Sequence, residues 1–235
     1  LDEDKINNPE LTPSSTQDVD KAGVVWELKS HWYCFYSLRY WQYLSLMILG
    51  NYGSTLLSYA YKPFGESSQT HDPISDDLLT WAASIGSGIV NGIARFTFGN
   101  LADKYSFRRL MSIILSVELL TCILFYWAAN VPALYFTCVL LNYGVLGGIY
   151  AIFPVSVTHV YGLEKGPLVY VQVLIGSFLS SLLNLFATKW ILPISNYGTL
   201  FMIGALVTVV SIVVVFFIKE ELDLERLQRK GVVEQ

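Results

Sequence analysis

The sequence predicts an all-α membrane protein. Hydrophobic residues make up 53% of the 235 residues and charged residues only 14%, whereas soluble domains contain about 25% charged residues. The apolar residues come in long continuous runs rather than in alternation, which favours spanning helices over the strands of a membrane barrel. Most of the charged residues lie before position 40, between the apolar runs, or after position 218.

Six apolar runs have about the 20 residues that a helix needs to cross the hydrocarbon core of a bilayer. The runs cover residues 41–61, 79–102, 110–129, 131–160, 166–189 and 196–218. Pro132 and Pro193 mark the short turns that separate the third run from the fourth and the fifth from the sixth. We therefore expect residues 41–218 to form a bundle of six transmembrane helices.

The segments outside the runs suggest how the chain is oriented. Residues 1–40 begin acidic and polar and end, from position 26, in an aromatic amphipathic stretch that suits the membrane interface. Lysine and arginine are concentrated on the side of the bundle that holds both termini, so the positive-inside rule predicts cytoplasmic termini in a plasma or organelle membrane. The expected domains are a cytoplasmic segment 1–40, the bundle 41–218 and a cytoplasmic tail 219–235.

The polar residues argue against several classes of function. The three cysteines, Cys34, Cys122 and Cys138, form no disulfide framework. No metal-ligand spacing and no pair of nucleophile and base is present, so we expect neither an enzyme nor a metal or cofactor site. The net charge is −4 and no large basic patch occurs, so we expect no nucleic-acid partner.

Arg95 lies deep in the second run, where an ionisable side chain is costly and normally faces a bundle interior or an aqueous cavity. At helical spacing it shares one face with Gly88, Asn91, Gly92 and Gly99. Two interpretations stay open. The guanidinium either donates to carbonyl groups of a neighbouring helix or binds an anion, since its fork of donors matches a carboxylate.

Glu118 is the other ionisable residue deep in a run, and few polar residues share its face. A protonated or locally paired carboxylate is the first interpretation, and a role in proton coupling is the second. Weaker candidates are other polar residues within the runs, namely Asn51, Ser54 and Ser58 in the first, Asn142 and Tyr143 in the fourth, and Ser177, Ser181 and Asn184 in the fifth. Such residues either line a pathway or join neighbouring helices.

Residues 99–110 read GNLADKYSFRRL and resemble the G-x-L-x-D-[RK]-x-G-[RK]-[RK] signature of the major facilitator superfamily. The second glycine of the signature is missing, and the basic pair stands one residue later. In that family the motif joins the second and third helices of each six-helix half, as it joins the second and third runs here. The resemblance implies a cytoplasmic gating motif of Gly99, Asp103, Lys104, Arg108 and Arg109.

Residues 91–103, NGIARFTFGNLAD, resemble the eighth helix of the monocarboxylate transporters and of the oxalate/formate antiporters. The longer stretch 62–110 is similar above all to oxalate/formate antiporter-like sequences of protists. These families carry an arginine four residues before the motif glycine, as Arg95 stands before Gly99. Two departures are clear. Asn91 replaces the aspartate of the proton-coupled monocarboxylate transporters, and the lysine in the eleventh helix of the oxalate/formate antiporters has no counterpart before Lys189.

The resemblance covers residues 41–218 and implies helices 7–12, the C-terminal half of a twelve-helix major facilitator fold. It implies a secondary transporter of a small organic anion, with Arg95 in a central cavity. We expect Asn91, Asn51, Asn142 and Tyr143 to line that cavity.

The partners expected on this basis are the anion, the lipid bilayer, and a missing N-terminal half or a partner half. A chain that begins with a leucine rather than a methionine agrees with a fragment of a longer transporter. The alternative is a half-transporter that does not transport and serves as a structural or assembly subunit of a larger membrane complex.

Overall fold

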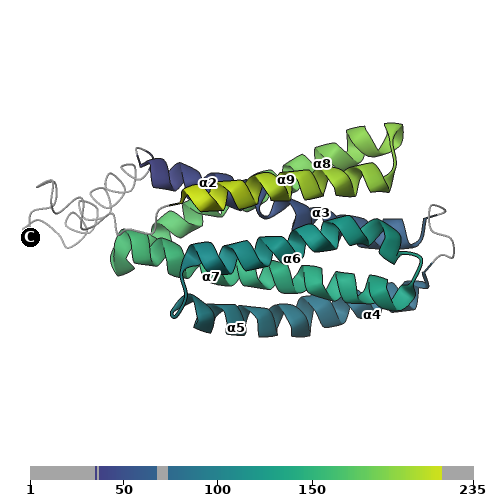
Figure 1. The fold of residues 1–235 in the computed structure, drawn as a ribbon, viewed down its shortest axis with the longest axis horizontal. Helices are drawn as coiled ribbons and strands as arrows, with labels where there is room; N and C mark the ends of the chain where they lie inside the picture. Colours follow the sequence, from purple (N-terminus) through teal and green to yellow (C-terminus); the bar gives the residue numbers. More distant parts are fainter. Residues whose placement is uncertain (1–34, 36, 68–73, 219–235) are drawn as a thin grey trace, which may run out of the picture.

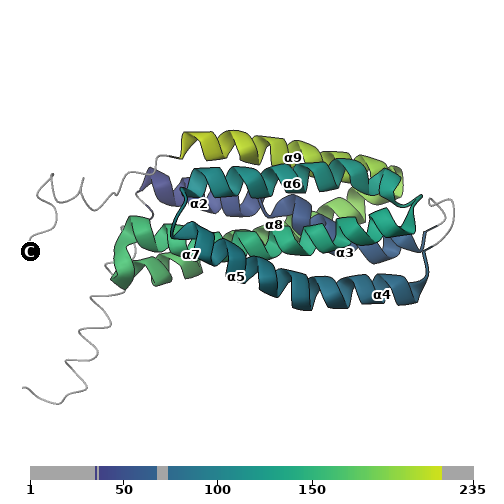
Figure 2. The same cartoon turned by 60° about the horizontal axis from the view of Figure 1, so that its bottom comes forward.

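A computed structural model describes residues 35, 37–67 and 74–218. Within these residues the chain forms helices and short connections, without a strand, so the predicted all-α fold class is confirmed. The helices run side by side along one long axis (Figures 1 and 2). The first 34 residues of the predicted segment 1–40 and the predicted tail 219–235 lie outside the described residues, and the division into three domains stays a prediction.

The helical elements in chain order are α2 (Leu38–Leu49), α3 (Tyr52–Gly65), α4 (Asp76–Ile85), η2 (Gly86–Val90), α5 (Asn91–Ala102), α6 (Phe107–Ala128), α7 (Pro132–Val173), α8 (Ile175–Phe186), η3 (Ala187–Ile191), η4 (Leu192–Ile194) and α9 (Tyr197–Phe217). The helices α6, α7 and α9 are long, and the other helical elements are short. The elements η2 and η3 are π-helical turns, and η4 is a single 3₁₀ turn.

Three of these helical stretches within the described residues are long and apolar enough to cross a membrane, namely Phe107–Ala128, Pro132–Ile194 and Tyr197–Phe217. The two N-terminal runs are interrupted. The first run divides into α2 and α3 between Leu49 and Tyr52, and the second contains the π-helical turn η2 between α4 and α5. The number of membrane crossings therefore stays a prediction.

The connection predicted at residues 161–165, between the fourth and fifth runs, is present as a sharp turn at Gly162. The element α7 consists of two helices that meet at this residue, which has φ 83° and ψ 165°. Glycine takes this left-handed φ without a steric penalty. A Cβ on Gly166 would lie 2.5 Å from the Cα of Thr158, so the chain turns sharply enough to bring residues on both sides of the break into contact.

The bundle has two apolar clusters with buried polar residues between them. One cluster is centred on Tyr43, Met47, Met111, Leu115, Ile149 and Phe153. The other is centred on Leu56, Phe64, Phe125, Tyr135, Leu200 and Phe201. Most of the buried polar residues fall, along the chain, between residues of one cluster and residues of the other, and these are Asn51, Glu118, Thr121, Asn142, Ser180, Asn184, Thr208 and Ser211. A polar layer thus crosses the middle of the bundle.

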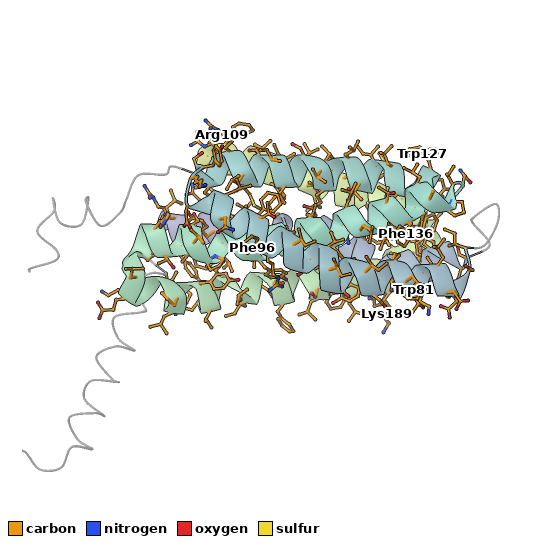
Figure 3. The ribbon with its side chains drawn as sticks, turned by 90° about the horizontal axis from the view of Figure 1, so that it is seen from below. Trp81, Phe96, Arg109, Trp127, Phe136 and Lys189 are labelled. Atoms are coloured by element: carbon orange, nitrogen blue, oxygen red, sulfur yellow. The ribbon has the colours of Figure 1, made fainter. Side chains whose placement is uncertain are left out.

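The outer surface is rich in large apolar side chains. Trp81, Phe96 and Trp127 are all more than half exposed and point away from the bundle (Figure 3). The pair α4 and α5 lies along one edge of the bundle in both ribbon views (Figures 1 and 2), and α5 packs mainly against α7. One face of α5 is therefore left without a neighbour among the described helices.

Candidate functional site

Arg95 is held by a residue on its own helix and by a residue on α7. Its Nε donates to Oδ1 of Asn91, one turn earlier on α5, at 2.8 Å. The Asn91 amide in turn donates to the backbone carbonyl of Tyr143 at 3.2 Å. The guanidinium carbon lies 5.6 Å from the centre of the Tyr150 ring, within the range of a cation–π interaction.

Tyr150 connects Arg95 to two further helices. Its hydroxyl lies 2.5 Å from Oγ of Ser177 on α8. The side-chain amide of Asn51, between α2 and α3, donates to the Tyr150 hydroxyl at 3.2 Å and to Ser177 Oγ at 2.9 Å. We refer to Asn51, Asn91, Arg95, Tyr150 and Ser177 as the Arg95 cluster. Four separate parts of the bundle contribute to it.

The cluster is buried on one side and open on the other. Asn51 is fully buried, whereas Arg95 is exposed, and the remaining members are partly buried. A Cβ added at Gly88, Gly92 or Gly99, the glycines on the same face of the second run, would meet no atom within 4 Å. The small, polar face expected around Arg95 therefore exists, and no described residue covers it.

The guanidinium keeps most of its donors unused. Within the described residues, the bond from Nε to Asn91 is the hydrogen bond that the Arg95 side chain makes, and the residue is exposed. A guanidinium with both terminal nitrogens unused presents a planar fork for a carboxylate or a similar anion. No cluster of three or more metal-binding side chains occurs in the part of the chain that the structure describes.

The other predicted lining residues take different positions. Asn142 donates to the backbone carbonyl of Ser54 at 3.1 Å and to Ser58 Oγ at 2.9 Å, so it joins α7 to α3. The ring of Tyr143 packs directly against Gly86 in the π-helical turn, and its carbonyl supports Asn91. Direct contact of Asn142 or Tyr143 with an anion stays a prediction.

Tyr150 is a member of the cluster that the sequence pattern does not indicate, and Ser177 is one of its weaker candidates. A tyrosine is a poor signal in a chain that has 15 of them. Tyr143 and Tyr150 are nevertheless seven residues apart, about two helical turns, and therefore share one face of α7. Because Tyr143 is a predicted lining residue, this shared face was the signal in the sequence that could have pointed to Tyr150.

The predicted gating motif divides into one residue that binds a helix end and several that face outward. Arg108 Nη2 donates to the carbonyl of Ile218 at 2.6 Å, where α9 ends, and a cation is favourable at the carboxyl end of a helix. Asp103, Lys104 and Arg109 are exposed, and Figure 3 shows Arg109 at one end of the bundle. The role of these residues in gating stays a prediction.

Glu118 is fully buried in α6, and its Oε1 accepts a hydrogen bond from the backbone N–H of Ser54 at 2.6 Å. The hydrogen-bond partner of Glu118 therefore comes from α3 and not from its own helix.

Comparison with known proteins identifies the family. The family model described as Major Facilitator Superfamily matches residues 42–233, which is more than half of the chain and includes both the Arg95 cluster and the predicted gating motif. A search of curated proteins finds no match. The all-α bundle and its long apolar helices agree with this match, and the chain belongs to the Major Facilitator Superfamily.

Proposed function

We propose that the protein is a secondary transporter of a small organic anion, of the monocarboxylate or oxalate/formate type. Members of its family are generally membrane transporters rather than enzymes, and its long apolar helices make it an integral membrane protein. The observation that carries the proposal is the guanidinium of Arg95, which is positioned by Asn91 and Tyr150 and keeps its terminal nitrogens unused.

A carboxylate suits this site for two reasons. The guanidinium fork donates two parallel hydrogen bonds to the two oxygens of one carboxylate, and such charge-assisted bonds are stronger than neutral ones. The anion also neutralises a positive charge that is costly within a membrane. The Tyr150 hydroxyl, fixed by Asn51 and Ser177, supplies a further polar group beside the guanidinium.

A second six-helix unit forms the other wall of the site in this proposal. The uncovered face of α5, with its open glycines, supports such a neighbour, because small residues let membrane helices approach closely. The two units rock against one another around the anion, so that the site opens to each side of the membrane in turn. Both termini of the chain lie on the cytoplasmic side.

The alternative, a subunit that does not transport, accounts less well for Arg95. An arginine kept for structural reasons would donate to carbonyl groups of a neighbouring helix, so that the cost of burying its charge is offset. Arg95 instead donates from Nε to Asn91, and within the described residues its terminal nitrogens have no acceptor.

The test is uptake of labelled formate, acetate, lactate and oxalate by the complete transporter in proteoliposomes. We expect uptake of at least one of these anions and competition among those that share the site. Lys189→Gln, which removes an exposed positive charge outside the Arg95 cluster, serves as the control for Arg95→Gln. Failure of all four anions to enter, or equal uptake in Arg95→Gln and Lys189→Gln, would contradict the proposal.

A further inference from the structure

The amino end of α3 is capped by a residue from another helix. The first N–H groups of a helix have no partner within it, and asparagine at the N-cap normally accepts one of them. Asn51 is the N-cap residue of α3 but makes no such bond. Its amide donates to Tyr150 and Ser177 in the Arg95 cluster, and the carboxylate of Glu118 accepts from Ser54 N–H instead.

Glu118 is enclosed by groups that carry no charge. A Cβ on Gly53 would lie 2.6 Å from Glu118 Oε1, 3.0 Å from Oγ1 of Thr208 on α9, and 3.1 Å from Sγ of Cys122 on α6. The backbone N–H groups of Gly53 and Ser54, the hydroxyl of Thr208 and the thiol of Cys122 therefore lie around this point, and none of them carries a charge. No salt bridge involves Glu118 in the described part of the chain, so no positive charge balances its own.

Two buried oxygens at this point lack a hydrogen bond of normal geometry within the described residues, namely Oε2 of Glu118 and Oγ of Ser54. The Ser54 hydroxyl nevertheless lies close enough to interact with the carboxyl group, and the two residues are joined through Oε1 and the backbone N–H. A buried carboxylate without a counter-charge is costly and is relieved when a cation or a proton neutralises it. One proton on the carboxyl removes the charge and adds the donor that a neighbouring oxygen needs.

A metal cation fits this point less well than a proton. Hard cations take about six oxygen ligands, and the hydroxyl of Thr208 already donates to the carbonyl of Gly204. We propose that Glu118 and Ser54 form a proton-binding site separate from the Arg95 cluster, and that proton binding there favours anion binding. The linkage to the anion rests on the proposed function.

Residues 51–54 connect the two sites. Asn51 belongs to the Arg95 cluster and Ser54 contacts Glu118, and the two residues are about one helical turn apart. An ionised Glu118 repels an anion bound beside Arg95, and a proton removes that repulsion. Two unit charges about 10 Å apart at an effective dielectric constant of about 20 interact strongly enough to change affinity roughly tenfold. Because binding linkage is reciprocal, the anion favours the proton by the same factor.

The experiment measures proton uptake when the purified complete transporter binds formate or acetate in weakly buffered solution. We expect the wild type to take up protons on binding and to bind the anion roughly tenfold more tightly as the pH falls through the titration of Glu118. Glu118→Gln keeps an oxygen that can accept from Ser54 N–H, but its amide group does not titrate. Anion binding by this variant should therefore be accompanied by no proton uptake, and this site should no longer make the affinity depend on pH.

Thr121→Val is the matched control, since Thr121 is buried on the same helix and its hydroxyl donates to Val117 within α6. It should retain proton uptake. Infrared spectra recorded without an anion, at a pH below the titration of Glu118, provide a readout independent of transport. The carbonyl band of a protonated carboxyl group should be present in the wild type and absent from Glu118→Gln.

The outcomes separate this inference from the proposed function. Anion binding without proton uptake in the wild type overturns the linkage, and persistence of the infrared band in Glu118→Gln overturns the proton site. Should Glu118→Gln fail to fold, proton uptake by the wild type still decides the linkage. Absence of binding by every anion contradicts the proposed function instead, and the infrared band then tests the proton site alone.

Discussion

Arg95 of α5 lies over the ring of Tyr150 of α7, with 5.6 Å between the guanidinium carbon and the ring centre. The hydroxyl of the same tyrosine is bonded to Ser177 and Asn51. One side chain thus supports the positive charge with its face and joins two other helices with its hydroxyl. These two functions can be separated by mutation.

Tyr150→Phe removes the hydroxyl and keeps the ring beneath Arg95. We expect anion affinity to fall about threefold to tenfold, because one net hydrogen bond contributes about 0.5–1.5 kcal/mol. Tyr150→Ala should weaken binding further, since it also removes the cation–π contact. Anion-dependent thermal stabilisation measures the effect. Tyr59→Phe, at an exposed tyrosine outside the cluster, is the control, and an equal loss in Tyr59→Phe would contradict the assigned role.

Arg95→Lys and Arg95→Gln distinguish charge from geometry. Lysine keeps the charge but not the planar fork, so affinity for acetate should fall by roughly tenfold to a hundredfold, the equivalent of about 1.5–3 kcal/mol for a charge-assisted hydrogen bond. Glutamine should abolish anion-dependent stabilisation while the protein stays folded, since a neutral side chain is easier to place within a membrane. Loss of thermal stability without loss of anion response in Arg95→Gln would favour a structural arginine.

The contact between Arg95 and Asn91 could be anticipated from the sequence, because the two residues are four apart and meet on one helix face. The contacts of Asn51 with Tyr150 and Ser177 could not. They join residues 99 and 126 positions apart and depend on how whole helices pack. Local patterns determine which residues share a face, and only tertiary packing determines which faces meet.

The same limit applies to the breaks in the helices and to Glu118. The apolar run 41–61 contains no proline, so hydropathy predicted one continuous helix where the structure has α2 and α3. The break also exposes the N–H of Ser54 to Glu118, a partner that the face of α6 alone does not reveal. In contrast, Pro132 predicted the start of α7 correctly, because proline fits the first turn of a helix.

Asn91→Asp should make anion binding depend more on pH. The new carboxylate would lie where Asn91 Oδ1 now accepts from Arg95 Nε at 2.8 Å. An ion pair with Arg95 competes with the anion, and protonation of the aspartate as pH falls ends that competition. We expect weaker acetate binding than in the wild type at neutral pH, with recovery at lower pH. Asn91→Ala, which adds no charge, should show no such recovery, and equal pH profiles for the two variants would contradict this account.

Gly53→Ala should destabilise the protein. Its Cβ would lie 2.6 Å from Glu118 Oε1 and 3.0 Å from Thr208 Oγ1, so either α3 or its neighbours must shift. Overpacking of this kind costs about 1–3 kcal/mol. Gly144→Ala is the matched control on α7, where the added Cβ would make an ordinary contact 3.5 Å from Val90. The measurement is thermal unfolding, and equal melting temperatures for the two variants would show that the crowding at Gly53 is relieved without cost.

Lys62 and Asp76 join α3 to the start of α4 at one end of the bundle, with Nζ and Oδ1 2.6 Å apart. The hydrogen bond and the positive charge of Lys62 hold the pKa of the Asp76 carboxyl below its ordinary value. In the same way, Asp76 raises the pKa of Lys62. The pair therefore exists in its charged form throughout the neutral range.

The sign of the pH dependence follows from the lowered pKa of Asp76. Its contribution to stability is complete above the pKa of an aspartate in the unfolded chain and is lost as the pH falls through the lower pKa of the folded state. An NMR titration of the Asp76 carboxyl carbon should show this lowered pKa, and Lys62→Gln should return it toward the ordinary value. Asp77→Asn, next to Asp76 on the exposed first turn of α4, is the control and should leave the titration largely unchanged. An Asp76 that titrates alike with and without Lys62 would mean that the two side chains do not pair in solution.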